Sequence, residues 1–101
     1  MNQFGEKVKL LREQKKMLQR QVAYELDIDT PMLSKIERGE RRATTDPIAI
    51  LASIFSITEK ELLSLWLADQ VYEVVKDEDV ALYAIHVAEE EIKYQTKKKK
   101  K

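Results

Sequence analysis

The sequence predicts an all-α protein, and three observations support this. Glycine and proline, the residues that most often interrupt helices, occur only twice each in 101 residues. Apolar side chains recur at intervals of three and four residues, the spacing that gives a helix one apolar face. No stretch alternates apolar and polar residues for long enough to indicate a strand.

Three helices are expected before residue 40. The first has an apolar face with i, i+4 and i+7 spacing, formed by Phe4, Val8 and Leu11. The second has one with i, i+4 and i+8 spacing, formed by Leu18, Val22 and Leu26. Asp29 is expected to cap a third helix, because its carboxylate can accept the unpaired N–H groups of a first turn. Leu33 and Ile36 form the apolar side of that helix. Gly39 is expected to end it, since glycine adopts the left-handed conformation without strain.

Three more helices are expected after a polar loop. Pro47 suits the first turn of a fourth helix, whose apolar face contains Ile48, Leu51, Ala52 and Phe55. Thr58 and Glu61 form a capping box that begins a fifth helix, running to about Lys76. The acidic stretch 77–79 is expected to end this helix and to cap a sixth. Because no Gly or Pro follows Pro47, one long bent helix is an open alternative to the preferred hairpin of two helices.

Composition excludes several classes of function. Cysteine is absent and His86 is the only histidine, which leaves no thiolate or His/Cys set for zinc. No Ser/His/Asp set or glycine-rich phosphate loop is present, so the protein is not expected to be an enzyme. No apolar run approaches the ~20 residues that cross a bilayer, and the amino terminus does not resemble a signal peptide. We therefore expect a cytoplasmic protein without a metal, a cofactor or a membrane partner.

The charges are unevenly distributed, although their formal sum is zero. Residues 1–42 carry ten Lys/Arg against seven Asp/Glu, whereas residues 43–96 carry three Lys against eleven acids. The last five residues are all lysine. A basic amino-terminal part is the typical electrostatic signature of a region that faces nucleic-acid phosphates.

Residues 18–39 have the pattern of a helix-turn-helix. Two short helices are joined by a turn of three or four residues, and the small Ala23 lies where they cross. This arrangement presents the amino-terminal residues of the second helix to a major groove. Double-stranded DNA is therefore the expected partner.

From Phe4 to Ile57 the chain resembles the Xre/Cro, phage-repressor-like family of DNA-binding domains. The most specific element is the run of residues 33–39, Leu-Ser-Lys-Ile-Glu-Arg-Gly, with support from Arg12, Gln19, Val22-Ala23, Leu51-Ala52 and Ile57. The chain departs from the family pattern at three places. Asp27 replaces the usual turn glycine, Leu18 replaces the usual Ser/Thr cap, and the proline after the motif arrives late, as Pro47. The resemblance implies a five-helix repressor-like DNA-binding domain, followed here by a C-terminal helical extension.

The resemblance also implies roles for individual residues. Four residues at groove-facing positions would read bases, namely Thr30, Pro31, Met32 and Lys35. Four others would bind phosphates, namely Gln19, Arg38, Arg41 and Arg42. Arg12 and Glu37 would form a structural ion pair between the first and third helices. The alternatives are ordinary solvated surface for Thr30, Lys35 and the loop arginines, and a helix-starting role alone for Pro31.

The C-terminal part is expected to form a dimer. We assign residues 1–57 to the DNA-binding domain, 58–96 to a helical hairpin and 97–101 to a disordered lysine tail. The fifth helix has more apolar surface than a thin hairpin can cover, so a two-fold homodimer is expected through Leu63, Trp66, Leu67, Val71 and Val74. The alternative is that both helices fold back on the amino-terminal core.

These features predict a sequence-specific transcriptional regulator, a repressor that acts as a homodimer. Two alternatives stay open. Family members also serve as antitoxins, in which case the acidic C-terminal half would bind a protein partner that co-purifies with the chain. Others are controllers that accompany restriction–modification genes, which a neighbouring methyltransferase gene would indicate.

Overall fold

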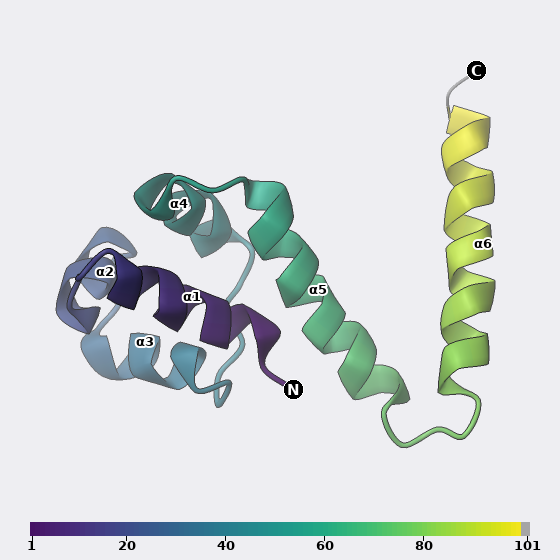
Figure 1. Ribbon diagram of the computed structural model, residues 1–101, viewed down its shortest axis with the longest axis horizontal. Helices are drawn as coiled ribbons and strands as arrows, with labels where there is room; N and C mark the ends of the chain where they lie inside the picture. The colour runs from purple at the N-terminus through teal and green to yellow at the C-terminus, as the bar shows by residue number, and fades with distance from the viewer. Residues whose placement is uncertain (100–101) are drawn as a thin grey trace. The chain divides into compact units, whose positions relative to one another are not determined.

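A computed structural model describes residues 1–99, and over that range the chain is helical without strands (Figure 1). Six helices follow in order: α1 (Gln3–Gln14), α2 (Gln19–Glu25), α3 (Thr30–Glu37), α4 (Asp46–Phe55), α5 (Glu59–Val75) and α6 (Ala81–Lys99). The predicted all-α class is confirmed. Residues 76–80 separate α5 from α6, so the C-terminal part is not one continuous helix. The chain divides into a compact unit from Met1 to Gln70 and a second unit from Val71 onward.

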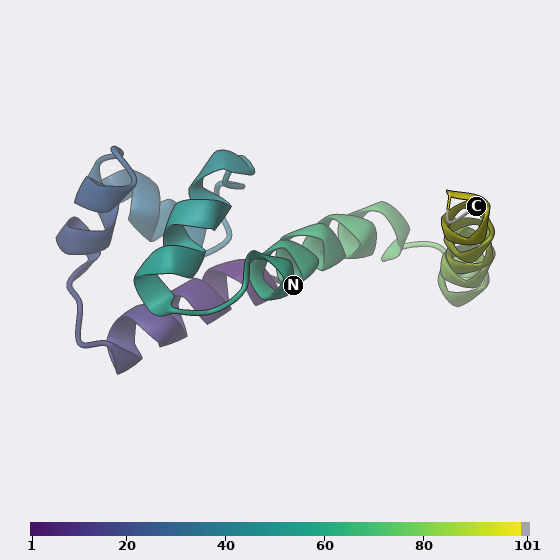
Figure 2. The same ribbon diagram turned by 90° about the horizontal axis from the view of Figure 1, so that it is seen from above.

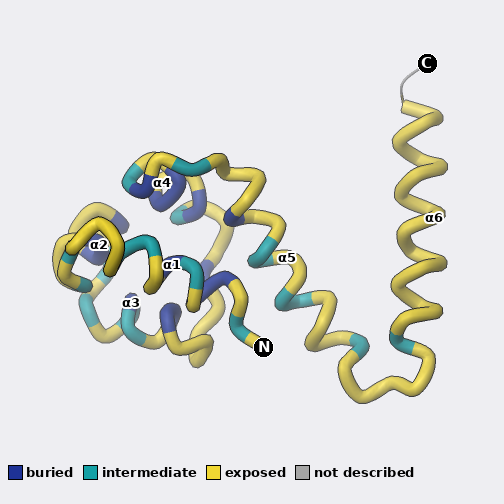
Figure 3. Tube along the Cα trace, viewed as in Figure 1, coloured by how far each residue is buried: buried dark blue, intermediate teal, exposed yellow. Residues whose placement is uncertain are grey.

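The first unit encloses one apolar core between α1, α2, α3, α4 and the beginning of α5. Figure 2 shows this unit from above, and Figure 3 shows that the buried residues are concentrated in this unit. Its largest fully buried side chains come from five helices: Leu33, Leu51, Leu62, Val8 and Val22. The predicted apolar faces of the first four helices therefore meet in one core.

The core continues beyond the domain boundary expected at residue 57. Leu62 of α5 has no exposed surface, and Leu65 and Trp66 pack against the same core. The compact unit ends at Gln70. The boundary moves because α5 begins only two residues after Ile57 and turns its first apolar side chain inward.

Local hydrogen bonds explain where the helices of the motif begin. The Asp29 carboxylate accepts the N–H of Met32 at 2.7 Å, which is the cap expected for α3. Leu18 precedes α2 without a side-chain cap, and the Gln21 side chain instead accepts the Leu18 N–H at 2.7 Å. The hydrogen bond from Leu18 to Gln21 pairs the backbone N–H of residue 18. A Ser or Thr side chain at this position would not have paired that N–H. Thr58 accepts the N–H of Glu61 at 3.1 Å and so caps α5.

Left-handed residues end the helices and shape the turns. Asp27, in the turn between α2 and α3, has a φ of 56°. The turn therefore has the left-handed residue that the family usually supplies as glycine, since aspartate tolerates this region better than most residues. Gly39 follows α3 with a φ of 77°, as expected for a glycine just past a helix end.

The second unit contains the last turn of α5 and the whole of α6. None of the residues of α6, Ala81–Lys99, is buried. The helix runs through Lys97, Lys98 and Lys99, which the sequence had placed in a disordered tail. Lysine is a good helix former, and cations suit the negative end of the helix dipole. Lys100 and Lys101, the rest of the expected tail, lie outside the described residues. Among the residues described, no helix is both long and apolar enough to cross a membrane.

Candidate nucleic-acid interface

Helix α3 has a buried side and an exposed side. Leu33 and Ile36 are buried in the core, whereas Pro31 and Lys35 are exposed on the outer surface. Thr30 begins the helix and is half-buried. The structure thus brings three of the four residues expected to read bases to the accessible part of one short helix.

Met32, the fourth residue of that group, is placed differently. It is half-buried and packs against the core of the first unit. Part of its side chain therefore stabilises α3 instead of facing outward. Its backbone N–H is also engaged, since the Asp29 carboxylate accepts it.

An ion pair joins α3 to α1. Arg12 Nε lies 2.7 Å from Glu37 Oε2, and Arg12 Nη2 lies 3.0 Å from Glu37 Oε1. The remaining Nη1 donates to the Met17 carbonyl at 3.0 Å. Only 2% of the Glu37 side chain and 11% of the Arg12 side chain are exposed. The hydrogen bonds to Glu37 raise the pKa of Arg12 above its usual value. The two residues expected to pair thus do so, in the two-pronged geometry that fixes the orientation of both side chains.

Gln19 is tied to the same carboxylate. Its Nε2 donates to Glu37 Oε1 at 3.0 Å, so one of its two amide hydrogens points inward. The sequence predicted this side chain as a phosphate ligand. Gln19 can still donate its other amide hydrogen to a phosphate. Its backbone N–H, at the first position of α2, can donate as well.

The three loop arginines differ in their contacts. Arg38 donates to the Glu40 carboxylate and to the Ser34 hydroxyl. This exposed contact raises the pKa of Arg38 and lowers the pKa of Glu40, in both cases mainly through the shared hydrogen bond. Arg42 donates to Gln70 Oε1 at 3.1 Å and lies over the Trp66 ring, 6.0 Å from its centroid. Arg41 is exposed on the surface of the loop.

Helix α5 holds this loop through Trp66. The indole Nε1 donates to the Ala43 carbonyl at 2.7 Å, while the ring itself is only half-exposed. The sequence had assigned Trp66 to a dimer interface. In the structure its N–H and part of its ring contact the chain's own loop, because a half-buried indole N–H needs an acceptor. The other four residues of that expected interface are exposed: Leu63, Leu67, Val71 and Val74.

Two residues that the sequence analysis missed fix the amino terminus of α1. The Asp69 carboxylate of α5 accepts the N–H groups of Gln3 and Phe4 at 2.9 and 3.0 Å. Asn2 accepts the N–H of Gly5 and donates to the Glu37 carbonyl at 2.8 Å. Asn2 could have been found as a cap from its place before the first apolar turn. No local sequence pattern identifies Asp69 as a cap of α1, because it lies far from α1 in the sequence.

The contacts of Asn2 also explain why both glycines are needed. A Cβ on Gly39 would lie 2.7 Å from Asn2 Cγ, and a Cβ on Gly5 would lie 2.4 Å from the Ile36 carbonyl oxygen. Larger residues would push α1 away from the end of α3. The ends of these two helices are therefore in backbone contact, in addition to the ion pair.

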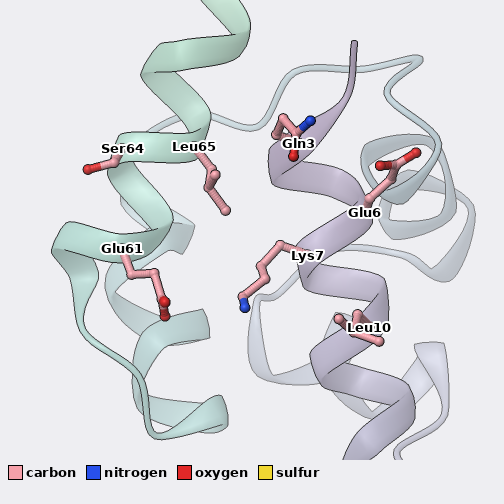
Figure 4. A pocket seen from close by; sticks show the side chains of 7 residues that line it. All are labelled: Gln3, Glu6, Lys7, Leu10, Glu61, Ser64 and Leu65. Carbon is pink, nitrogen blue, oxygen red and sulfur yellow. The ribbon is translucent and has the colours of Figure 1, made fainter.

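A groove of about 540 Å³ lies between α1 and α5 (Figure 4). Its lining mixes apolar groups with charges of both signs: Gln3, Glu6, Lys7, Leu10, Glu61, Ser64 and Leu65. In the figure Lys7 and Glu61 project into the groove from opposite walls. The groove is distinct from the exposed side of α3.

Three exposed side chains that can ligate metals lie close together on α6. One ligand atom from each of His86, Glu89 and Glu90 lies within 4.8 Å of the others, although no metal was expected from the sequence. All three residues are exposed, and Glu89 and Glu90 also approach Lys93 at 4.0 and 3.7 Å. Such i, i+3 and i+4 pairs are ordinary on a solvated helix.

The two short helices, the turn between them and the exposed side of α3 define a DNA-binding regulator of the helix-turn-helix class. The chain belongs to the helix-turn-helix family, whose sequence profile matches residues 8–62, and the Xre/Cro-type resemblance is confirmed. The chain is also similar to the control protein C.BamHI of Bacillus amyloliquefaciens. The two are 36% identical over 61 residues, which cover 59% of this chain and 75% of that protein. No solved structure matches the chain significantly.

Proposed function

We propose that this regulator is a sequence-specific repressor that binds an operator as a homodimer and reads the major groove with α3. The observation that carries the proposal is the exposed side of α3. Lys35 and Pro31 project from a short helix whose other side is fixed by Leu33, Ile36 and the ion pair of Glu37. A rigid helix with a basic exposed side is suited to hydrogen bonding with base edges, above all with guanine O6 and N7.

The loop after α3 supplies the phosphate contacts in this proposal. Arg41 is exposed there, and Arg42 is oriented by Trp66 and Gln70. Contacts of this kind set the position of a protein on DNA but do not select a sequence. Holding Arg42 in place before binding reduces the side-chain entropy that is lost when the phosphate is engaged.

The homodimer is supported by the exposed apolar residues of α5. Leu67 and Val71 are each 48% exposed and Val74 is 78% exposed. A symmetric dimer would cover these residues, and two copies of α3 would then read half-sites about 34 Å apart, one turn of the DNA helix.

The test is to select bound sequences from a random duplex library and to titrate the selected duplex at two salt concentrations. We expect an inverted repeat with half-sites about 10 base pairs apart, centre to centre. Affinity should fall with salt, as phosphate contacts require. A promoter carrying the selected site should lose transcription when the protein is added. Failure to enrich any sequence, with weak and wholly salt-driven binding, would contradict the proposal. Co-purification of a second protein chain would then favour the antitoxin alternative.

A second candidate function is that of a controller that accompanies restriction–modification genes. The observation that favours it is the similarity to a protein named a control protein. This function predicts that the selected operator lies upstream of the chain's own gene, beside a methyltransferase gene. An operator found only at unrelated genes would exclude it.

A further inference from the structure

Helix α6 is long and carries several large apolar residues, but none of its residues is buried in the described part of the chain. It spans 19 residues, about 28 Å at 1.5 Å per residue. Six of its large apolar residues are at least 40% exposed: Leu82, Tyr83, Ile85, Val87, Ile92 and Tyr94. Helices in proteins derive most of their stability from packing an apolar face. A helix without buried residues is therefore expected to pack its apolar side chains against a partner.

The apolar residues of α6 include a stripe with heptad spacing. Ala81, Ile85, Ala88 and Ile92 follow one another at intervals of four, three and four residues, so they lie on one side of the helix. Small residues alternate with large ones along this stripe. Alternation of this kind lets two helices approach closely and interdigitate.

The charges at the two ends of α6 are opposite. Asp77, Glu78 and Asp79 precede the helix, and Lys97, Lys98 and Lys99 form its last turn. Each group already suits its own end of the helix dipole. The two groups are also nearly equidistant from Ala88, which lies nine residues after Asp79 and nine residues before Lys97.

We propose that α6 pairs with α6 of a second copy of this chain in antiparallel orientation, centred on Ala88. In this register Ala88 lies opposite Ala88, and Ile85 of one copy lies within one residue of the position opposite Ile92 of the other. Asp77–Asp79 of each copy then meet Lys97–Lys99 of its partner. A parallel pair would instead place acids beside acids and lysines beside lysines. The inference rests on the proposed homodimer and specifies a contact that lies outside the family match to residues 8–62.

The first test compares two faces of α6 in the full-length chain by sedimentation over a range of concentrations. Ile85→Asp places a charge in the stripe, and Tyr83→Asp is the matched control on the opposite side of the same helix. We expect Ile85→Asp to raise the dimer dissociation constant by at least about tenfold, as for loss of a buried interface residue. Tyr83→Asp should leave it unchanged. Equal dissociation constants for both variants, or a monomeric wild-type chain, would overturn the proposal.

The second test concerns orientation. One variant converts Asp77, Glu78 and Asp79 to lysine, and the other converts Lys97, Lys98 and Lys99 to glutamate. In an antiparallel dimer each variant alone should dimerise more weakly than the wild type, because like charges now meet at both ends. An equimolar mixture should regain dimers, since each end then joins lysines to glutamates or aspartates. If neither variant alone is weakened, the antiparallel pairing is wrong.

Two further measurements separate this inference from its alternatives. Binding of each variant to a duplex with a single half-site tests the DNA-binding function alone, and we expect Ile85→Asp to retain it. A lower melting temperature of Ile85→Asp without a change in mass would show that α6 packs on its own chain, which overturns the proposal. A flatter salt dependence of DNA binding for the glutamate variant, with its dimer constant unchanged, would assign the lysines to DNA and overturn it as well.

Discussion

Glu37 of α3 accepts hydrogen bonds from two nitrogens of Arg12 of α1, at 2.7 and 3.0 Å, with both side chains almost fully enclosed. Glu37 is the only charged residue that is buried among those described. Gln19 of α2 donates to the same carboxylate. One buried carboxylate therefore connects α1, α2 and α3, and it fixes the orientation of α3 relative to the other two helices.

Arg12→Met is expected to destabilise the protein, because it leaves the Glu37 carboxylate buried without its cation. The expected loss is about 3 kcal/mol in the free energy of unfolding, typical of a broken buried pair. In a unit of this size it corresponds to a fall of more than about 10 °C in the melting temperature. Thermal unfolding followed by circular dichroism measures it.

The double variant Arg12→Met/Glu37→Leu tests whether the unpaired charge causes the loss of stability. It removes the charge that Arg12→Met leaves unpaired, so it should be more stable than the single variant. Glu73→Gln is the control, since Glu73 pairs with Lys76 at 2.9 Å on the exposed surface. Its melting temperature should equal that of the wild type. A single variant as stable as the wild type would mean that the pair does not fix α3.

Asp69→Ala is expected to loosen the amino terminus of α1. The carboxylate accepts two N–H groups that have no partner within the helix, and its charge suits the positive end of the helix dipole. The expected cost is about 1–2 kcal/mol of stability. Denaturant unfolding measures it, with the exposed Glu25→Ala as the control. Equal stability of the two variants would contradict the assigned cap.

Lys35→Ala separates base reading from phosphate binding. If Lys35 donates to a guanine, its loss should weaken binding to the selected operator by about 10- to 100-fold, the value of one good base contact. Binding to random duplex should hardly change. Arg41→Ala should weaken both and reduce the salt slope by about one, as expected for a lost phosphate contact. Equal losses on operator and random DNA for Lys35→Ala would remove it from the base-reading group.

Glu40→Gln is expected to strengthen DNA binding. Glu40 holds the Arg38 guanidinium, so its carboxylate competes with a phosphate for the same donors. Releasing Arg38 should raise affinity for random duplex roughly threefold at low salt and steepen the salt dependence. Glu73→Gln removes an equal charge from another exposed pair and serves as the control. Equal gains for both variants would show a general charge effect instead.

Mild acid should not reproduce the effect of Glu40→Gln. The pKa of Glu40 is lowered by Arg38, so the carboxylate keeps its charge to a lower pH than an ordinary glutamate. The contact with Arg38 is therefore present at neutral pH and is lost only as the pH falls through that lowered pKa. Between pH 7 and pH 5 the ratio of wild-type to Glu40→Gln affinity should stay constant.

Features that depend on neighbouring residues could be predicted before the structure was known. Helix spacing, the Asp29 cap and the left-handed Asp27 and Gly39 are local, because each involves groups only a few residues apart. The motif and its family followed from the same short-range pattern. The Arg12–Glu37 contact was expected only through the family resemblance, since nothing in its spacing reveals it.

Which long-range contacts form could be learned only from the packing of the helices. Leu62 is buried in the core of the first unit. The Asp69 carboxylate accepts the first N–H groups of α1, and the Trp66 indole donates to the Ala43 carbonyl. These partners are separated by 23 or more residues, and no local pattern links them. Their choice depends on which buried polar group is left without a partner once the helices pack, and that is fixed only when the whole core has closed.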